Sequence, residues 1–318
     1  MNDYIKLLGC LLLSFIICFI FCKIHIKYVF STPKDQIEVE SLHPKHQFKS
    51  CGGVDFILST LVVFIIFNFS KFDHKNVIIL IFTTIYYGLI GLVDDLIKIK
   101  GKDHRGLSGW LRIALEVIGV FILSQMTSIE LLKFVKMQNS YFYIGGFAII
   151  YMVFCIVGCC NAINLTDGLD GLVGITYLLA ISPFLYLAIF QQNFIIATFL
   201  MALIGSLLAY LCFNFNPSKL IMGDVGSISL GALLAVCSIL LNKELLLLIA
   251  GGIYIIEALS VILQVGYFKL SKGKRIFKMA PLHYHFIKKG MNDVSVVLMF
   301  IIFGIVLSIL CTIIGVIL

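Results

Sequence analysis

Long apolar runs, separated by short polar stretches, recur along the whole chain. A helix needs about 20 apolar residues to cross the hydrocarbon core of a bilayer, and backbone polar groups in lipid must be hydrogen-bonded within their own segment. The pattern therefore predicts an all-α polytopic membrane protein with about ten transmembrane helices, and without a flexible linker we expect a single domain over residues 1–318. The runs cover residues 4–22, 54–69, 77–93, 109–125, 141–160, 172–190, 194–213, 226–241, 245–264 and 295–318.

Composition and charge support this prediction and add an orientation. The chain is 60% hydrophobic and 13% charged, whereas soluble domains carry roughly 25% charged residues. Most of the 24 lysines and arginines lie in one set of alternate connections, those that follow the first, third, fifth, seventh and ninth runs. By the positive-inside rule these connections face the cytoplasm and both termini are extracytoplasmic. Because the basic residues are spread over several loops, we expect no binding of nucleic acid.

The connection at 126–140 is the longest on the opposite side. It mixes Leu131 and Leu132 with Lys133 and Lys136, a pattern typical of a chain that lies along a membrane surface. We therefore expect this segment at the extracytoplasmic interface.

Carboxylates gather in the connections assigned to the cytoplasmic side. They are Asp94, Asp95, Asp167, Asp170 and Asp224. Capping of a helix end would explain any one of them, but carboxylates beside a bilayer are costly and usually functional. Five of them on one face would repel one another unless a cation intervened. Oxygen ligands and shared phosphates are typical of Mg²⁺, so the sequence predicts a Mg²⁺-dependent phosphate site. The ten cysteines lie mostly in apolar runs and form no Cys-x-x-Cys pair, so no zinc or redox site is expected.

Basic residues near these clusters divide into two groups. Lys45 and Lys98 lie close in sequence to the polar clusters, and we expect them to contact substrate. The others are expected to anchor the chain at anionic lipid headgroups; they include Lys100, Lys102, Lys288 and Lys289.

A pair of histidines follows Met-Ala-Pro after the ninth run. His283 and His285 are two residues apart, so on a loop both rings can face one site with Tyr284 turned away. Imidazole can orient a phosphate or stabilise its developing charge. Glu116 and Glu257 lie inside apolar runs, and we expect them to tie helices together.

These groups together suit phosphoryl transfer between a water-soluble nucleotide and a lipid phosphate. That chemistry depends mainly on positioning and neutralisation of charge. A secondary transporter is the alternative from another class, but it would place its acidic residues near the bilayer midplane rather than at the ends of the apolar runs.

Four motifs resemble those of the polyprenyl-phosphate N-acetylhexosamine-1-phosphate transferases. They are Asp94-Asp95, the stretch from Asn161 to Gly171, Met-Gly-Asp-Val-Gly-Ser at 222–227, and Met-Ala-Pro-Leu-His-Tyr-His at 279–285. Their order and spacing match over nearly the whole chain. Within this superfamily, the stretch at 164–171 and Gly-Lys-Arg-Ile-Phe-Lys-Met-Ala-Pro at 273–281 are most similar to the phospho-N-acetylmuramoyl-pentapeptide transferases.

The resemblance implies a reaction at the cytoplasmic face of the bacterial cell membrane. Undecaprenyl phosphate would attack UDP-N-acetylmuramoyl-pentapeptide, release UMP and form lipid I, the first lipid intermediate of peptidoglycan. The resemblance also implies a homodimer. The nearest alternative is the same chemistry on UDP-N-acetylglucosamine, and a further one is a non-catalytic paralogue that binds lipid phosphate.

The resemblance also implies roles for residues of this chain. Asp224 would ligate Mg²⁺, Asp94 and Asp95 would face the lipid phosphate and the reacting diphosphate, and His283 would complete the catalytic set. The substrate pocket would be lined by Lys45, Ser50, Lys98, Asn164, Asp167, Gly168, Leu169, Asp170, Gln264 and His285.

The chain departs from the family pattern at three places. Phe-Lys-Ser-Cys-Gly-Gly at 48–53 stands where Thr-Pro-Thr-Met-Gly-Gly is usual, and Tyr284 interrupts three consecutive histidines. Ile221 replaces an aromatic residue before Met-Gly-Asp, which would remove a stacking surface for uracil. Since the aspartates are intact, the departures bear on nucleotide affinity rather than on the reaction.

Overall fold

The computed structural model describes residues 3–28, 50–100, 106–127, 134–137, 140–143 and 145–317. Within these ranges, 10 helices are long and apolar enough to cross a membrane, which confirms the predicted polytopic helical fold. They are α1 (Asp3–Tyr28), α2 (Gly53–Asn68), α3 (Lys75–Lys100), α4 (Gly109–Met126), α6 (Ala148–Thr166), α7 (Leu172–Phe190), α8 (Phe194–Asn214), α9 (Gly223–Leu240), α11 (Gly252–Leu270) and α13 (Asp293–Ile317). Short helices are α10 (Leu247–Ala250) and α12 (Leu282–Lys288), with 3₁₀ turns at Phe69–Lys71, Gly145–Phe147 and Glu244–Leu246.

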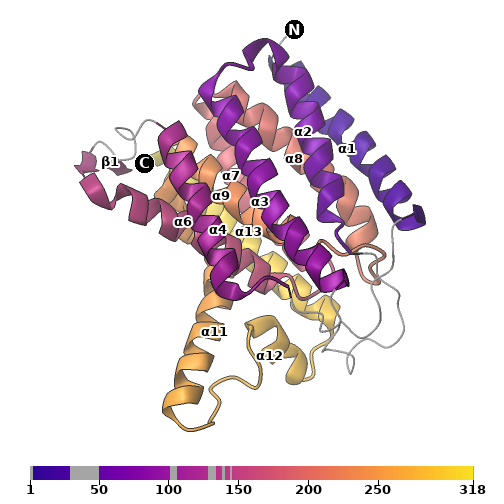
Figure 1. Ribbon diagram of the computed structural model, residues 1–318, viewed down its shortest axis with the longest axis vertical. Coiled ribbons are helices and arrows are strands. Elements are labelled where there is room, and N and C mark those ends of the chain that lie inside the picture. Colours follow the sequence, from indigo (N-terminus) through magenta and orange to yellow (C-terminus); the bar gives the residue numbers. More distant parts are fainter. Residues whose placement is uncertain are drawn as a thin grey trace.

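Helix α9 forms the centre of the bundle. Every residue from Val225 to Ile239 is buried, and Figure 1 shows the helix enclosed by its neighbours, which include α2, α3, α6 and α7. The helix is rich in Gly, Ala and Ser, and small residues let membrane helices approach closely. A Cβ added at Gly231 would collide with the backbone of Cys160 in α6. One added at Gly91 of α3 would collide with the carbonyl group of Asp224.

Four helices, α1, α3, α6 and α11, continue beyond the apolar runs that predicted them, and two of these extensions reach the site. Helix α3 continues to Lys100 and α6 continues to Thr166. Asp94, Asp95 and Lys98 therefore lie on the last turns of α3 rather than in a loop. The apolar run covers only the part of a helix that crosses the hydrocarbon core. A helix that ends in polar turns outside the lipid therefore extends beyond its apolar run.

A small β-hairpin corrects the assignment of the fifth run. Strand β1 (Phe134–Met137) pairs antiparallel with β2 (Ser140–Tyr143), so residues 141–143 are strand, and α6 begins at Ala148 after a 3₁₀ turn. Val135 and the aromatic residues at 134 and 141–143 favour strand, which explains the departure from helix. Placement of this segment along the membrane interface stays a prediction, and 128–133 and 138–139 lie outside the described residues.

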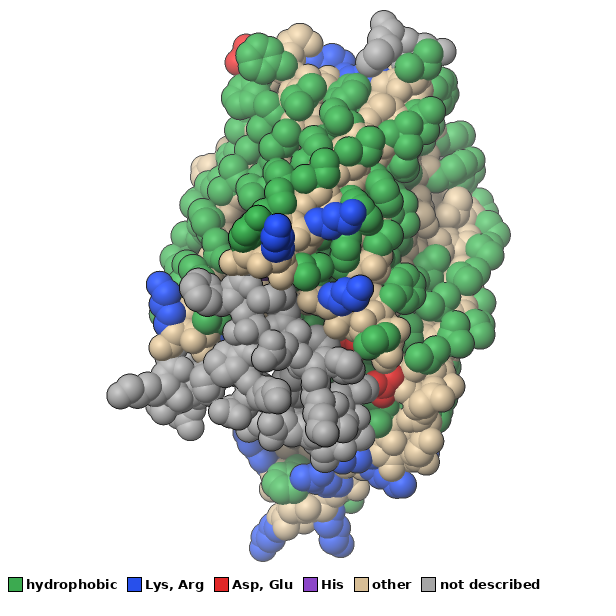
Figure 2. All heavy atoms as spheres, turned by 90° about the vertical axis from the view of Figure 1, so that its right-hand side faces the viewer, with side chains coloured by type: hydrophobic (Ala, Val, Ile, Leu, Met, Phe, Trp, Pro, Cys, Tyr) green, Lys and Arg blue, Asp and Glu red, His purple; other side chains and the backbone are tan. Residues whose placement is uncertain are grey.

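Polar and apolar surfaces are separated along the long axis. Figure 1 shows α11 extending below the rest of the bundle, with α12 beside it. In Figure 2 apolar side chains cover the upper part of one face, and Lys and Arg gather at the lower end. A bilayer around the apolar part would leave the basic end at its surface. That this end is cytoplasmic stays a prediction.

Candidate active site

Three of the predicted carboxylates meet where four helix ends converge. These ends are the last turns of α3 and α6 and the first turns of α4 and α9. Each of Asp94, Asp95 and Asp224 offers a carboxylate oxygen, and the three atoms lie within 4.8 Å of one another. A donor set made only of carboxylate oxygens fits a hard divalent cation such as Mg²⁺.

Asp95 fixes the start of α9. Its two carboxylate oxygens accept the backbone N–H groups of Asp224 and Val225, each at 3.0 Å. These N–H groups belong to the first turn of a helix, where the helix itself offers them no acceptor. Gly223 just before them has φ +72° and lies tight against Asp95, so the turn requires glycine. The cap between helices thereby places Asp224 beside Asp94.

Lys98 joins the other two carboxylates. Its Nζ lies 2.6 Å from Asp94 Oδ2 and 2.8 Å from Asp224 Oδ2. Asp94 lies one helical turn before Lys98, and its Oδ1 accepts the backbone N–H of Leu107 at 2.6 Å. The structure therefore brings Lys98 into the carboxylate cluster, and its predicted contact with substrate stays a prediction.

Arg112 is a member of this cluster that the sequence reasoning missed as a site residue. Its guanidinium donates to Asp224 Oδ2 at 3.4 Å, to Asn164 Oδ1 at 3.3 Å and to Asn161 Oδ1 at 3.0 Å. The i, i+4 pair of Arg112 and Glu116 inside an apolar run was the available signal. Asn161 Nδ2 donates to Glu116 Oε2 at 2.7 Å, which confirms the predicted role of Glu116 in tying helices together.

Asn164 of α6 lies directly against Asp224, the candidate metal ligand. Its Nδ2 donates to Asp224 Oδ1 at 3.0 Å and to Ser227 Oγ at 2.9 Å. Lys98, Arg112 and Asn164 thus surround the Asp224 carboxylate with hydrogen-bond donors from three other helices. Such donors hold one carboxylate rotamer in place for a ligand.

The turn between α6 and α7 holds two aspartates with different surroundings. Asp167 is partly exposed, yet protein encloses it on most sides, and this burial raises its pKa to about 7, helped by the charges of Asp224 and Asp95. Asp170 Oδ2 instead accepts the backbone N–H of Ser218 at 3.0 Å. Asp170 therefore ties this turn to the connection between α8 and α9, and Leu169 between the two aspartates is buried.

His283 and His285 do not face one site. They lie on the short helix α12, where residues two apart point in opposite directions. His283 is fully buried, whereas His285 Nδ1 accepts the backbone N–H of Lys278 at 3.0 Å. Tyr284 is not turned away, because its hydroxyl donates to the carbonyl oxygen of Gly168 at 3.2 Å. Burial and then the charge of Asp167 raise the pKa of Tyr284 to about 12, so it remains a donor. The expectation of a loop was wrong at this point.

The remaining predicted residues hold loops at the edge of the site. Gln264 Oε1 accepts the backbone N–H groups of Ile276 at 3.2 Å and Phe277 at 2.9 Å. The carbonyl oxygen of Ser50 accepts from His25 Nε2 at 2.9 Å. Lys45 lies outside the described residues, as does Lys102.

The described part of the departure at 48–53, residues 50–53, lies against the departure at Ile221, and residues 48 and 49 lie outside the described residues. Gly52 N–H donates to the carbonyl oxygen of Ile221, and Gly53 N–H to that of Met222, both at 2.9 Å. Burial, followed by the charge of Asp95, raises the pKa of the Cys51 thiol to about 12. The segment at 50–53 thus forms a neutral wall behind the carboxylate cluster.

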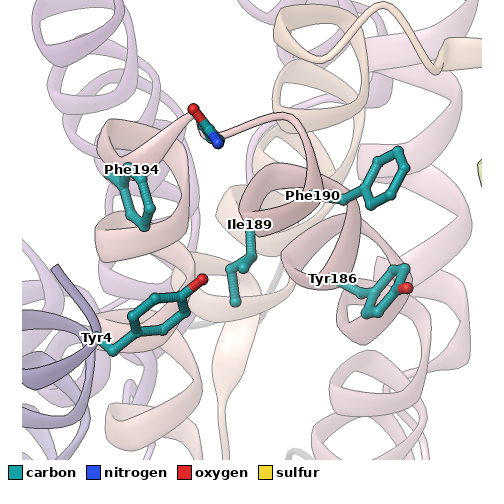
Figure 3. A pocket seen from close by; sticks show the side chains of 6 residues that line it. Tyr4, Tyr186, Ile189, Phe190 and Phe194 are labelled. Carbon is teal, nitrogen blue, oxygen red and sulfur yellow. The ribbon is translucent and has the colours of Figure 1, made fainter.

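A separate open hollow of about 530 Å³ lies at the opposite helix ends (Figure 3). Its lining carries no carboxylate, lysine, arginine or histidine, so it contributes no phosphate chemistry. The lining residues are Tyr4, Tyr186, Ile189, Phe190, Gln192 and Phe194.

Comparison with known proteins identifies relatives along most of the chain. The model of the family described as glycosyl transferase family 4 matches residues 77–242. A phospho-N-acetylmuramoyl-pentapeptide-transferase of Streptococcus pneumoniae (strain CGSP14) is 39% identical over 269 residues, which cover 81% of this chain and 82% of the relative. The transferase of the same description from Listeria innocua serovar 6a is 41% identical over 254 residues, 78% of each chain. That of Bacillus thuringiensis (strain Al Hakam) is 39% identical over 280 residues, 85% of this chain and 86% of the relative.

Proposed function

Because the chain belongs to glycosyl transferase family 4 and, within it, to the phospho-N-acetylmuramoyl-pentapeptide transferases, we propose that it catalyses their reaction. It transfers phospho-N-acetylmuramoyl-pentapeptide from UDP-N-acetylmuramoyl-pentapeptide to undecaprenyl phosphate, with release of UMP. The product is lipid I of peptidoglycan synthesis. The observation that carries this proposal is the cluster of Asp94, Asp95 and Asp224 with Lys98 and Arg112 at one end of the helix bundle.

The cluster suits the bonds that change. An oxygen of the lipid phosphate attacks the sugar-linked phosphorus of the nucleotide, and the bond from that phosphorus to the bridging oxygen breaks, so the electron pair leaves with UMP. Catalysis of such transfer is mainly positioning and stabilisation of spread negative charge. Lys98 and Arg112 supply fixed positive charge at Asp224. Asp94 is the group that positions the attacking phosphate or accepts its proton.

Mg²⁺ is the proposed cofactor, and Asp224 its proposed ligand. Both oxygens of Asp95 accept backbone N–H groups, whereas the Asp224 carboxylate accepts from the side chains of Lys98, Arg112 and Asn164. Side chains can move to admit a cation, so Asp224 is the better ligand. When bound, Mg²⁺ would neutralise charge on the diphosphate. The carboxylates would hold this cation where the end of α3 meets the start of α9, and Asn164 keeps the Asp224 carboxylate oriented.

The remaining roles follow from position around the cluster. Asp167, Gly168 and the neighbouring residues form one wall of the proposed nucleotide pocket, and α12 closes it through His283 and Tyr284. Gln264 and His285 support the connection between α11 and α12. The basic lower end of the molecule in Figure 2 supports a cytoplasmic site in the bacterial cell membrane. Assembly as a homodimer is part of the proposal.

The decisive experiment measures release of UMP. Purified protein, Mg²⁺, undecaprenyl phosphate and UDP-N-acetylmuramoyl-pentapeptide are expected to yield UMP, and UDP-N-acetylglucosamine in its place is expected to yield little. Asp224→Asn should abolish turnover, whereas Asp73→Asn, an exposed residue at the other ends of these helices, should not. Absence of UMP release by folded wild-type protein would refute the proposed reaction. Faster release of UMP from UDP-N-acetylglucosamine would show that this nucleotide sugar is the donor instead.

A further inference from the structure

Glu257 and His283 form a fully buried pair that the reaction outlined above does not explain. Glu257 lies on α11 and His283 near the start of α12, and both side chains are 0% exposed. Glu257 Oε1 accepts the backbone N–H of His283 at 3.1 Å, and its Oε2 lies 3.3 Å from His283 Nδ1. One carboxylate therefore holds both the helix end and the ring.

The opposite ring nitrogen has no partner. His283 Nε2 is buried and makes no hydrogen bond to any residue that the structure describes. A Cβ added at Gly168 would collide with this nitrogen, so Nε2 faces the backbone of the turn that carries Asp167. A buried polar atom without a partner destabilises the folded state. A ligand atom that reaches Nε2 would remove this cost.

We propose that Glu257 is a positioning residue that keeps a proton on His283 Nδ1, so that Nε2 is presented to a phosphate oxygen of the substrate at the Gly168 turn. The inference rests on the proposed function, since it deepens the role of the same site. A carboxylate behind an imidazole fixes the tautomer and stabilises the imidazolium. Nε2 takes up a proton from solvent as the phosphate binds, and the resulting imidazolium, stabilised by Glu257, donates to the phosphate oxygen as the turn at Gly168 shifts. Gly168 has no side chain that would block this contact.

The tautomer is measured without any turnover. Nitrogen-15 NMR of histidine-labelled protein, assigned with His283→Asn, is expected to show Nδ1 protonated in the wild type. In Glu257→Gln the single amide oxygen stays with the backbone N–H, and the amide NH₂ faces Nδ1, so the proton should move to Nε2. An unprotonated Nδ1 in the wild type would overturn the proposal, whether or not the variant folds.

The ligand is tested in the same spectra. UDP-N-acetylmuramoyl-pentapeptide with Mg²⁺, and separately undecaprenyl phosphate, are added to the wild type, with uridine as the control that lacks phosphate. A shift of Nε2 to the protonated range with either phosphate compound supports the proposal and shows which phosphate is bound. No shift with both, or the same shift with uridine, would overturn it.

Kinetics separate positioning from a purely structural role. Glu257→Gln should lower kcat/KM roughly 10–100-fold, as loss of a carboxylate behind a functional histidine does. Ser260→Ala removes a buried hydroxyl that donates to the backbone carbonyl oxygen of Glu257. It should leave kcat/KM close to the wild-type value, because this hydroxyl bonds to the helix backbone and not to His283. In a His283→Asn background Glu257→Gln should add little, because both changes remove one function. Fully additive losses would contradict the inference. A wild type that releases no UMP would refute the reaction and leave the tautomer measurement standing.

Discussion

Replacement of Asp95 by asparagine separates its role as a helix cap from any role in binding metal. The wild-type carboxylate accepts two backbone N–H groups from the first turn of α9, each at 3.0 Å. The asparagine side chain would keep one oxygen and turn its NH₂ group toward the second N–H. One charge-assisted hydrogen bond is lost and one buried donor is left unpaired.

The magnitude follows from these two bonds. A hydrogen bond to a charged group contributes about 1.5–3 kcal/mol to stability, so we expect a loss of roughly 2–3 kcal/mol from the cap. Removal of one of three neighbouring carboxylates also relieves repulsion, which opposes this loss. Asp94→Asn gives the same relief, yet its remaining oxygen can still accept the N–H of Leu107. Asp94→Asn also loses the ion pair with Lys98, so the difference between the two variants is a lower bound on the contribution of the cap.

The assay is thermal unfolding of detergent-solubilised protein in EDTA, without Mg²⁺. We expect Asp95→Asn to unfold roughly 4–12 °C below Asp94→Asn, taking about 2–4 °C for each kcal/mol. Equal unfolding temperatures, or a higher one for Asp95→Asn, would refute the role of Asp95 as the cap of α9. Asp95 would then be a candidate metal ligand like Asp94 and Asp224.

Two further predictions concern neighbouring groups. The pKa of Asp167 is raised to about 7, so the folded state binds this proton more tightly than the unfolded state does. The free energy of unfolding should therefore fall as pH rises from about 4 to about 7. Asp167→Asn should flatten this part of the pH dependence in thermal unfolding, and an unchanged slope would contradict the raised pKa of Asp167. Arg112→Lys should lower kcat/KM for UMP release about 10-fold or more. The reason is that an ammonium cannot replace a guanidinium that reaches Asp224, Asn164 and Asn161 at once. A loss below about 2-fold would exclude a positioning role for Arg112.

The hydrophobic pattern was sufficient to predict the ten long helices, because the bilayer imposes both length and apolar composition on each of them. It could not predict where helices end in water. The last turns of α3, which carry Asp94 and Lys98, have no apolar signal to mark them. The hairpin at 134–143 was likewise hidden, since aromatic and β-branched residues are as apolar as those of a helix.

The site was predictable in its residue types and less so in its partners. Five aspartates in separate connections indicated a cluster, and three of them meet. The sequence could not show that the Asp95 oxygens accept backbone N–H groups of α9, or that Asp170 holds a loop. An aspartate that caps a helix and one that binds a metal are the same residue in a sequence. His283 and His285 diverge since α12 is a helix, and its length of 7 residues is too short to read from periodicity.

The position of the metal tests the central claim most directly. Crystals grown with UDP-N-acetylmuramoyl-pentapeptide and Mn²⁺ in place of Mg²⁺ would locate the ion by anomalous scattering. We predict a single strong peak within ligand distance of the Asp224 carboxylate, at the meeting point of α3 and α9, in contact with the diphosphate. A bound nucleotide with its metal elsewhere, and with Asp224 still paired to Lys98 and Arg112, would contradict the account.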